Sequence, residues 1–388
     1  MKCIYVIILV IVAQCLFAQE TFSSIVKENG MRFTVSEEGF RGEGWDEILA
    51  QVQSHDNVLI GEDHFFNEIP FFISKLSDEV TFDNLFCEID PYMADILEGK
   101  IKDLEEEELK SFTSSFGSAF SFYALAPEFD LMKKMVRSNT KLIGTDQISI
   151  RSEGLLAAQL KEQTQSEKAR AIYADIEKKS PLYFSEFMKG NGMPYFLSEE
   201  LTGQLERLKK CELSPDEQSL IEDLELSQQI YLNQDHHLRI QLMKHNMLEH
   251  FDQITQSKNL FKYGAVHLPK GESLMEIQDI GTLVNNLSDG QFESSLHLMI
   301  IGQKGSQGVP FEGMENGQVD PNGEDLKSYK VFFDAMKSSE WQVFDNKKIL
   351  AQLKSNKIDV EDETLERVIK GYDYLIVIPQ VSAAEFLK

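Results

Sequence analysis

Short apolar runs that end in glycine or in charged side chains recur along the chain. The first run covers residues 58–60, and Gly61, Glu62, Asp63 and His64 follow it directly. An apolar run of this length predicts a short buried strand, and glycine is a common place for such a strand to end. Similar runs predict further strands at residues 85–89, 141–146, 259–265, 295–301 and 374–378.

Helical spacing of apolar residues separates these strands. Trp45, Ile48, Leu49 and Val52 fall on one face of a helix predicted over residues 45–53. Strands that alternate with helices are typical of α/β folds. We therefore predict an α/β fold built on one sheet. Further helices of this part of the chain are predicted at residues 69–76, 91–116 and 128–137.

The helical pattern continues from residue 151 to residue 258 without a convincing strand. Leu, Glu, Gln, Lys and Ala dominate these residues, and proline and glycine interrupt them. We interpret residues 151–258 as a helical insertion between strands of the sheet, with a last helix from about residue 234 to residue 255. Residues 20–43 and 303–328 follow neither period, and we expect an irregular arm and a long surface loop there.

The first residues have the pattern of a secretory signal peptide. Lys2 gives a positive start, residues 4–12 form an unbroken apolar run, and small or polar residues follow. We therefore predict that residues 1–19 are cleaved and that the protein is exported, either to the periplasm or out of the cell. The mature chain, residues 20–388, is expected to form a single domain. An uncleaved anchor is one alternative, and a lipid on Cys15 is another.

Acidic residues outnumber basic ones by 64 to 38, and the formal net charge is −26. This balance disfavours nucleic acid, whose phosphates attract clusters of Lys and Arg. It also disfavours anionic membrane surfaces, so no stable membrane insertion is expected after signal cleavage. We expect a small-molecule substrate as the partner, and the sequence leaves the oligomeric state open. Only Cys87 and Cys211 remain in the mature chain, too few for a disulfide framework.

Charged or imidazole side chains follow several of the predicted strands directly. Ligands of α/β folds bind at the carboxyl ends of the strands, so we expect these side chains to converge. An imidazole among carboxylates suits general acid–base catalysis, in which His takes a proton from water. It equally suits a divalent metal ion with an open position for water. The candidates are Glu62, His64, Glu88, Asp146 and His267.

Each candidate alone also has a structural interpretation. A carboxylate after a strand is often a helix cap, as Asp63 or Asp90 could be. Recurrence at several strand ends favours a functional site over separate structural roles. The sequence contains no GxSxG elbow, no GxxxxGK[ST] phosphate loop and no GxGxxG fingerprint, so these other chemistries find no support.

The helix that precedes the strand at residues 259–265 carries one more candidate. Arg239, Met243, Asn246 and His250 fall on one face of this helix. A structural helix with a mixed face is one interpretation. In the other, Arg239 points into the site and steadies an anionic or carbonyl group. The remaining histidines of this helix, His236, His237 and His245, are expected at the surface.

Together these motifs resemble the erythromycin-esterase-like and ChaN-like superfamily, with the Tiki proteases as more distant relatives. The resemblance runs from about residue 40 to residue 380. It implies a three-layer α/β/α fold with a mostly parallel or mixed central sheet and a large helical insertion. It rests on residues 60–64, 87–88 and 144–146, on Arg239 with Met243 and Asn246, on residues 263–267 with Lys270, and on residues 373–377.

The esterase branch implies hydrolysis by water that His64 activates, without a metal. Glu62, Glu88, Arg239 and His267 would then orient water and substrate, and Asp146 joins them as a sixth catalytic candidate. The Tiki branch implies a divalent-metal hydrolase, with His64, Glu62, Glu88 and His267 as ligands. The ChaN branch implies haem binding. A single residue between Glu62 and His64 looks more like ChaN, since the esterases usually have two.

We therefore predict an exported hydrolase that cleaves an ester or amide bond and needs no cofactor. A protein that binds haem or another small ligand is the first alternative. A metal-dependent hydrolase is the second.

Overall fold

The computed structural model describes residues 21–36, 39–336 and 339–388. The predicted signal peptide lies outside the described residues, so cleavage and export stay predictions. In the described part of the chain, no helix has both the length and the apolar character that a membrane crossing needs. The chain divides into two compact units. The first unit extends to residue 81 and includes residues 260–308 and 315–383, and the second includes residues 82–259, 309–314 and 384–388.

The first unit contains a twisted, mostly parallel sheet. Among its described residues, seven strands follow one another in the order β2-β1-β10-β11-β7-β3-β6. Strands β3, β7 and β11 are parallel, with Ile60 beside Leu298 and Ile300 beside Ile376. Strand β10 pairs antiparallel with β11, and β1 pairs antiparallel with β10. The bounds are β1 (Gly30–Ser36), β2 (Gly39–Arg41), β3 (Asn57–Glu62), β6 (Asn259–Gly264), β7 (Leu296–Gly302), β10 (Trp341–Asp345) and β11 (Tyr374–Ile378).

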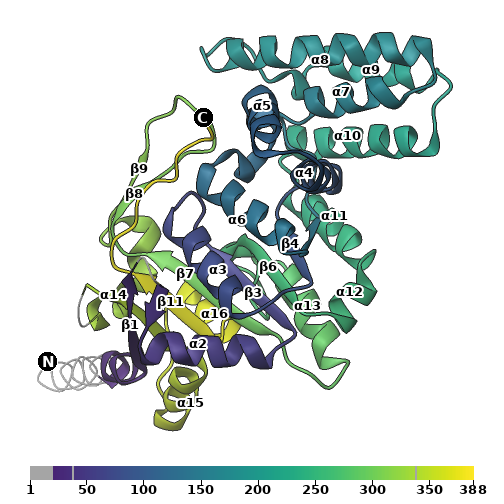
Figure 1. Cartoon of the computed structure of the whole chain (residues 1–388). Helices are drawn as coiled ribbons and strands as arrows, with labels where there is room; N and C mark the ends of the chain where they lie inside the picture. The colour runs from purple at the N-terminus through teal and green to yellow at the C-terminus, as the bar shows by residue number, and fades with distance from the viewer. Residues whose placement is uncertain (1–20, 37–38, 337–338) are drawn as a thin grey trace, which may run out of the picture. The chain divides into compact units, whose positions relative to one another are not determined.

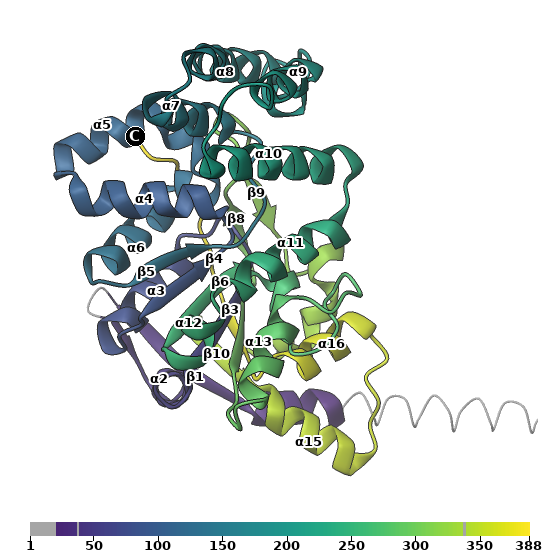
Figure 2. The ribbon, with the colours of Figure 1, turned by 90° about the vertical axis from the view of Figure 1, so that its right-hand side faces the viewer.

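Helices cover the strands of this unit. Strands β3, β6 and β7 are buried along their whole length, and such strands need cover on both faces of a sheet. Helix α2 packs on β1, α13 on β3 and α15 on β11, and Figures 1 and 2 show these elements from two sides. The expected three-layer α/β/α fold is confirmed. The helices are α2 (Glu43–Ser54), α3 (Glu68–Glu79), α13 (Ile280–Asp289), α14 (Lys330–Ala335), α15 (Asn346–Asn356) and α16 (Glu363–Gly371).

Two strands occupy the stretch predicted to be an irregular arm. Only Phe33 of strand β1 is buried, so the local sequence lacks the alternation that marks a strand. Strand β10, far later in the chain, supplies the hydrogen bonds of β1, and Phe33 packs on Trp341 with ring centroids 5.5 Å apart. The prediction of an irregular arm is therefore wrong. The loop predicted over residues 303–328 likewise contains a short hairpin, β8 (Gly305–Gln307) and β9 (Gly317–Val319).

The second unit contains the helical insertion. Residues 151–258 are all described and contain helices but no strand. The unit nevertheless begins at residue 82, because strands β4 (Asn84–Cys87) and β5 (Lys141–Gly144) belong to it. Its helices are α4 (Pro91–Asp103), α5 (Glu106–Phe116), α6 (Ala126–Arg137), α7 (Glu153–Gln163), α8 (Glu167–Phe187), α9 (Glu199–Leu208), α10 (Pro215–Asn233), α11 (His236–Leu248) and α12 (Phe251–Gln256).

One helix predicted from about residue 234 to residue 255 is in fact two. Helix α11 ends at Leu248 and α12 begins at Phe251. His250, which lies between them, has φ −107° and ψ 30°, outside the α-helical range. No proline or glycine marks this break in the sequence, so pattern alone did not reveal it.

The ends of β4 and β5 touch through a glycine. A Cβ on Gly144 would lie 2.4 Å from the carbonyl oxygen of Asp90 and 2.7 Å from that of Ile89. The N–H of Asp146 donates to the same Ile89 carbonyl at 2.8 Å. Backbone packs on backbone here, and neither side can move without losing these contacts. Gly144 therefore fixes the distance between two strand ends that carry predicted site residues.

We predict that Gly144→Ala destabilises the protein. The new methyl group meets backbone atoms instead of a flexible side chain, and overpacking of this kind costs roughly 1–3 kcal/mol. Denaturant unfolding followed by circular dichroism measures the change.

Gly99→Ala is the matched control. Gly99 lies inside helix α4 of the same unit, and a Cβ there meets nothing within 4 Å. Alanine in a helix should raise stability by about 0.4–1 kcal/mol. Equal effects of the two substitutions would contradict the close approach at Gly144.

Candidate functional site

Glu62, the last residue of β3, is at the centre of the first group of charged side chains. Its Oε1 accepts a hydrogen bond from Nζ of Lys262 at 2.6 Å and lies 2.8 Å from Nδ1 of His64. Glu62 and Lys262 are each 4% exposed, while the side chain of His64 is 21% exposed. One buried carboxylate oxygen thus joins a lysine to an imidazole that solvent can reach.

Lys262 keeps Glu62 ionised. Burial alone would raise the pKa of Glu62, but the charge of Lys262 and the contact with His64 outweigh burial and lower it. An ionised carboxylate only accepts hydrogen bonds, so Nδ1 of His64 has to be the donor. In that tautomer Nε2 carries the lone pair. The arrangement prepares His64 to take up a proton at Nε2.

A second imidazole, that of His267, lies on the 3-10 turn η4 (Ala265–His267), which packs against β3. Nδ1 of His267 lies 2.9 Å from Oδ2 of Asp279, and both side chains are buried. The other oxygen of Asp279 accepts from the N–H of Ile280 at 2.7 Å and caps helix α13. The helix start therefore fixes the carboxylate, and the carboxylate fixes the ring.

The approach of η4 to β3 depends on Gly61. A Cβ there would lie 3.0 Å from Cα of Ala265 and 2.7 Å from the hydroxyl oxygen of Tyr372. That hydroxyl donates a hydrogen bond to the carbonyl oxygen of Ala265. Glycine thus lets the turn that carries His267 pack on the strand that carries Glu62.

Asp63 adds a titratable carboxyl beside His64. Burial raises the pKa of Asp63 to about 6, although the charge of His64 acts to lower it. The alternative role as a helix cap does not apply, because the N-cap of helix α3 is Asn67. Asp63 therefore changes its charge close to neutral pH.

The remaining predicted residues meet within the second unit, around Arg239 of helix α11. Nε and Nη2 of Arg239 donate to the two carboxylate oxygens of Asp146 at 2.9 and 2.6 Å, and Nη2 also donates to Oε1 of Glu88 at 2.8 Å. Burial would lower the pKa of Arg239, but the two carboxylates raise it well above its usual value. Nη1 of Arg239 makes none of these three hydrogen bonds, all of which join described residues.

The predicted face of this helix packs on the ends of β4 and β5. Nδ2 of Asn246 donates to the carbonyl oxygen of Thr145 at 3.0 Å, and Met243 is fully buried. His250 meets the ring of Phe86 edge-on. His236, His237 and His245 are exposed, as expected. Asp90 is the N-cap of α4, accepting from the N–H of Met93 at 2.8 Å, and burial raises its pKa to about 7.

Each unit thus gathers part of the predicted set. Glu62 touches His64 in the first unit, and Arg239 holds Glu88 and Asp146 in the second. That all six candidates, His267 included, act on one substrate stays a prediction.

A divalent metal site needs several ligand side chains that lie close together. No three His, Cys, Asp or Glu side chains among them are grouped as a metal would require. Oε1 of Glu62 already accepts from Lys262, so a cation at this oxygen would have to displace a buried ammonium group. As arranged, these residues do not fit a divalent metal ion.

Lys262 and Asp279 are site residues that sequence reasoning missed. A signal for Lys262 was present, because it is the one charged residue inside the apolar run at residues 259–265, and a lysine in a buried strand needs a partner. Asp279 lies in a polar stretch after His267 and gave no comparable signal.

Comparison with known proteins gives similarity of fold only. No family model matches the sequence, and no curated protein matches it. A mutant of erythromycin esterase EreC in its open conformation is similar with a TM-score of 0.58 and 14% identity, over 92% of this chain and 99% of that chain. A protein from Bacillus cereus is similar with a TM-score of 0.56 and 14% identity, over 95% of this chain and 99% of that chain.

Two further solved structures are also among the matches. A succinoglycan biosynthesis protein aligns with a TM-score of 0.56 and 13% identity, over 95% of this chain and 99% of that chain. ChaN of Campylobacter jejuni, solved with cofacial haem, reaches a TM-score of only 0.33 at 10% identity, which is too low to relate the two folds. The chain therefore has the fold of erythromycin esterase EreC.

We predict that Lys262→Met destabilises the protein most at neutral pH. The pKa of Glu62 is lower in the folded protein than in the unfolded chain. Ionised Glu62 therefore contributes to the free energy of unfolding above the pKa of the unfolded chain, and this contribution is lost as pH falls through the pKa of the folded protein. Without Lys262 the buried carboxylate is uncompensated, at a cost of roughly 3–5 kcal/mol. Protonation of Glu62 removes that cost, so the deficit should shrink between pH 7 and pH 5 in denaturant unfolding.

Lys330→Met is the control. Lys330 pairs with Asp334 on the surface of α14, and both side chains are about 60% exposed. Surface pairs contribute little, so this variant should follow the wild type at both pH values. A Lys262→Met deficit that does not change with pH would contradict an ionised Glu62.

Proposed function

We propose that this chain, whose fold is that of an esterase, is a hydrolase that cleaves an ester or amide bond with water activated by His64. The observation that supports the proposal is the contact of Nδ1 of His64 with the ionised carboxylate of Glu62 at 2.8 Å. The similarity to erythromycin esterase EreC favours an ester as the substrate. At 14% identity that similarity does not choose a particular ester.

The proposed reaction begins with proton transfer from water to Nε2 of His64. The hydroxide oxygen bonds to the carbonyl carbon, and the imidazolium that forms is stabilised by Glu62 through Nδ1–H. When the tetrahedral intermediate collapses, the C–O bond of an ester or the C–N bond of an amide breaks. His64 returns its proton to the oxygen or nitrogen of the leaving group. The products are an acid and an alcohol or amine, and His64 ends in its starting state.

Lys262 and His267 have supporting parts in this proposal. Lys262 keeps Glu62 ionised throughout, so the tautomer of His64 does not change between turnovers. His267 is oriented by Asp279 in the same way as His64 is by Glu62. We assign His267 to orienting the water or the substrate carbonyl, because it is fully buried and less suited to exchange protons with solvent.

A binding protein for haem or another small ligand is the alternative function. In a receptor, His64 would contribute to ligand affinity and no turnover would accompany binding. The partial exposure of His64 beside a charged carboxylate favours the catalyst instead, since a tautomer fixed by an ionised partner serves proton transfer.

We predict that His64→Ala lowers kcat/KM for p-nitrophenyl butyrate by about 10²–10⁴-fold, the usual contribution of a general base. Imidazole added to the His64→Ala variant should restore part of the rate. The assay is spectrophotometric release of p-nitrophenol, run with and without a chelator, and the rate is expected to persist in the chelator.

His245→Ala is the matched control, because the side chain of His245 is 74% exposed and lies 4.0 Å from a carboxylate oxygen of Glu249 at the surface. This variant should keep the wild-type rate. Wild-type activity in His64→Ala would refute the proposal, and binding of the ester without turnover in the wild type would favour the receptor alternative.

The sequence prediction that Arg239 serves the same reaction has its own test. Lysine lacks the planar fork that holds Asp146 and Glu88 together, so Arg239→Lys should lower kcat about 10²–10³-fold if the guanidinium stabilises a developing oxyanion. Arg367→Lys is the control, since Arg367 also donates through Nη2 to two carboxylates, Glu272 and Glu276, but on the surface. Equal kcat values for the two variants would remove Arg239 from the reaction.

A further inference from the structure

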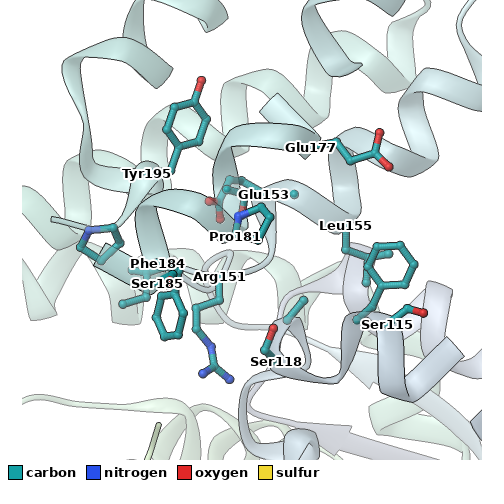
Figure 3. Close-up of a pocket in the computed structure, with 16 residues that line it drawn as sticks. Ser115, Ser118, Arg151, Glu153, Leu155, Glu177, Pro181, Phe184, Ser185 and Tyr195 are labelled. Atoms are coloured by element: carbon teal, nitrogen blue, oxygen red, sulfur yellow. The ribbon is translucent and has the colours of Figure 1, made fainter. Parts of the chain in front are cut away.

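A cavity of about 220 Å³ lies inside the second unit, between helices α7 and α8 and residues 115–119 (Figure 3). Most of its wall is apolar. Drug-sized ligands occupy pockets of about 300–1,000 Å³, so this cavity suits a smaller molecule. Phe116, Leu155, Pro181, Phe184 and Pro194 are among the residues of the wall.

One carboxylate oxygen in this wall, Oε2 of Glu153, lacks a hydrogen bond within the described part of the chain. Glu153 begins helix α7 and is 2% exposed. Ser180 of helix α8 bonds to the same carboxyl group. A buried acceptor without a donor costs free energy until something supplies the hydrogen bond. Glu153 lines the cavity, so a molecule bound there can supply that donor.

A backbone acceptor lies in the same wall. Pro181 stands inside helix α8 and has no N–H, so it cannot donate to the carbonyl oxygen of Glu177 four residues earlier. Glu177 and Pro181 both line the cavity. The side-chain carboxylate of Glu177 is occupied, since it accepts from Lys161 at 2.8 Å. Oε2 of Glu153 thus has no hydrogen-bond donor among the described residues, and the carbonyl oxygen of Glu177 does not receive the N–H that a residue other than proline at position 181 would supply.

The nearest cation does not neutralise Glu153. The guanidinium of Arg151 lies beside the rings of Phe184 and Phe311, 5.0 and 5.1 Å from their centroids. Figure 3 shows its charged end directed away from the carboxyl group of Glu153. Burial accordingly raises the pKa of Glu153 to about 7, and the charge of Arg151 is the smallest of the influences that lower it.

We propose that this cavity binds a small primary amine as its ammonium ion, with the charged head at Glu153 and an apolar tail against Pro181 and Phe184. An ammonium group has three donors and no acceptor, which matches a wall that offers acceptors. Its charge compensates a buried carboxylate, and an aromatic ring adds attraction for a cation. The net charge of −26 concentrates cations around the protein. This inference does not depend on the proposed hydrolase function.

n-Butylammonium is the probe for the test, with butan-1-ol and butyrate as neutral and anionic molecules of similar size. Ligand-observed NMR titration of the full-length mature protein measures each affinity. n-Butylammonium is expected to bind about tenfold or more tightly than either analogue, because only it forms a charge-assisted hydrogen bond with a carboxylate. Tighter binding of butyrate would mean that Arg151 is the receptor and would overturn the proposal.

Two isosteric variants separate the named carboxyl group from its neighbour. Glu153→Gln should weaken n-butylammonium binding about ten- to a hundredfold. Glu177→Gln changes the same residue type in the same wall, but at a carboxylate that Lys161 already occupies, so affinity should stay within about twofold of the wild type. Thermal unfolding of both variants checks that they are folded. Equal affinities of the two variants would refute the role of Glu153.

The affinity for n-butylammonium should also increase as pH rises. An alkylammonium group, like that of lysine, keeps its charge between pH 6 and pH 8, so any change in this range comes from the protein. Glu153 loses its proton across this range, whereas Arg151 keeps its charge, and Tyr195 of the wall has a raised pKa and stays neutral. Binding should therefore strengthen as pH rises through about 7 in the wild type and stay constant in Glu153→Gln. Loss of affinity with rising pH would contradict the proposal.

Discussion

The buried carboxylate of Glu62 is the constraint on which the first unit's candidate site depends. Taking an ionised carboxylate out of water costs several kcal/mol unless a partner of opposite charge is also buried. Lys262 is that partner, and it can reach Glu62 only if β6 lies beside β3 in the sheet. The pairing of strands therefore decides the charge of Glu62. That charge then decides the tautomer of His64.

The second unit meets a similar demand with a different residue. Glu88 and Asp146 follow the neighbouring parallel strands β4 and β5. Both carboxylates contact Arg239, and without this cation they would repel each other. A guanidinium binds both because its donors are fixed in a plane, whereas the ammonium of Lys262 acts as a single point of charge. Helix α11 is thus held to the strand ends by Arg239 as well as by the packing of Met243.

Local pattern was enough to predict the strands whose own residues are buried. Strand β3 is one of these strands. The helical stretch at residues 151–258 and the Arg239 face of helix α11 were likewise predicted from the spacing of their own residues. Strand β1 was missed because only Phe33 is buried and its partner β10 lies far along the chain. The predicted site residues came from strand ends, while Asp279 was missed because its role depends on a turn that brings it back to His267.

The hydrogen bonds of Arg239 span 93 and 151 positions of sequence. During synthesis on the ribosome, Glu88 emerges first, Asp146 follows, and Arg239 comes only after most of the helical insertion has been made. Until then the two carboxylates at the ends of β4 and β5 repel each other and keep their water. Contacts of such long sequence separation form only after long loops have been closed, so we expect the Arg239 cluster to form late in folding.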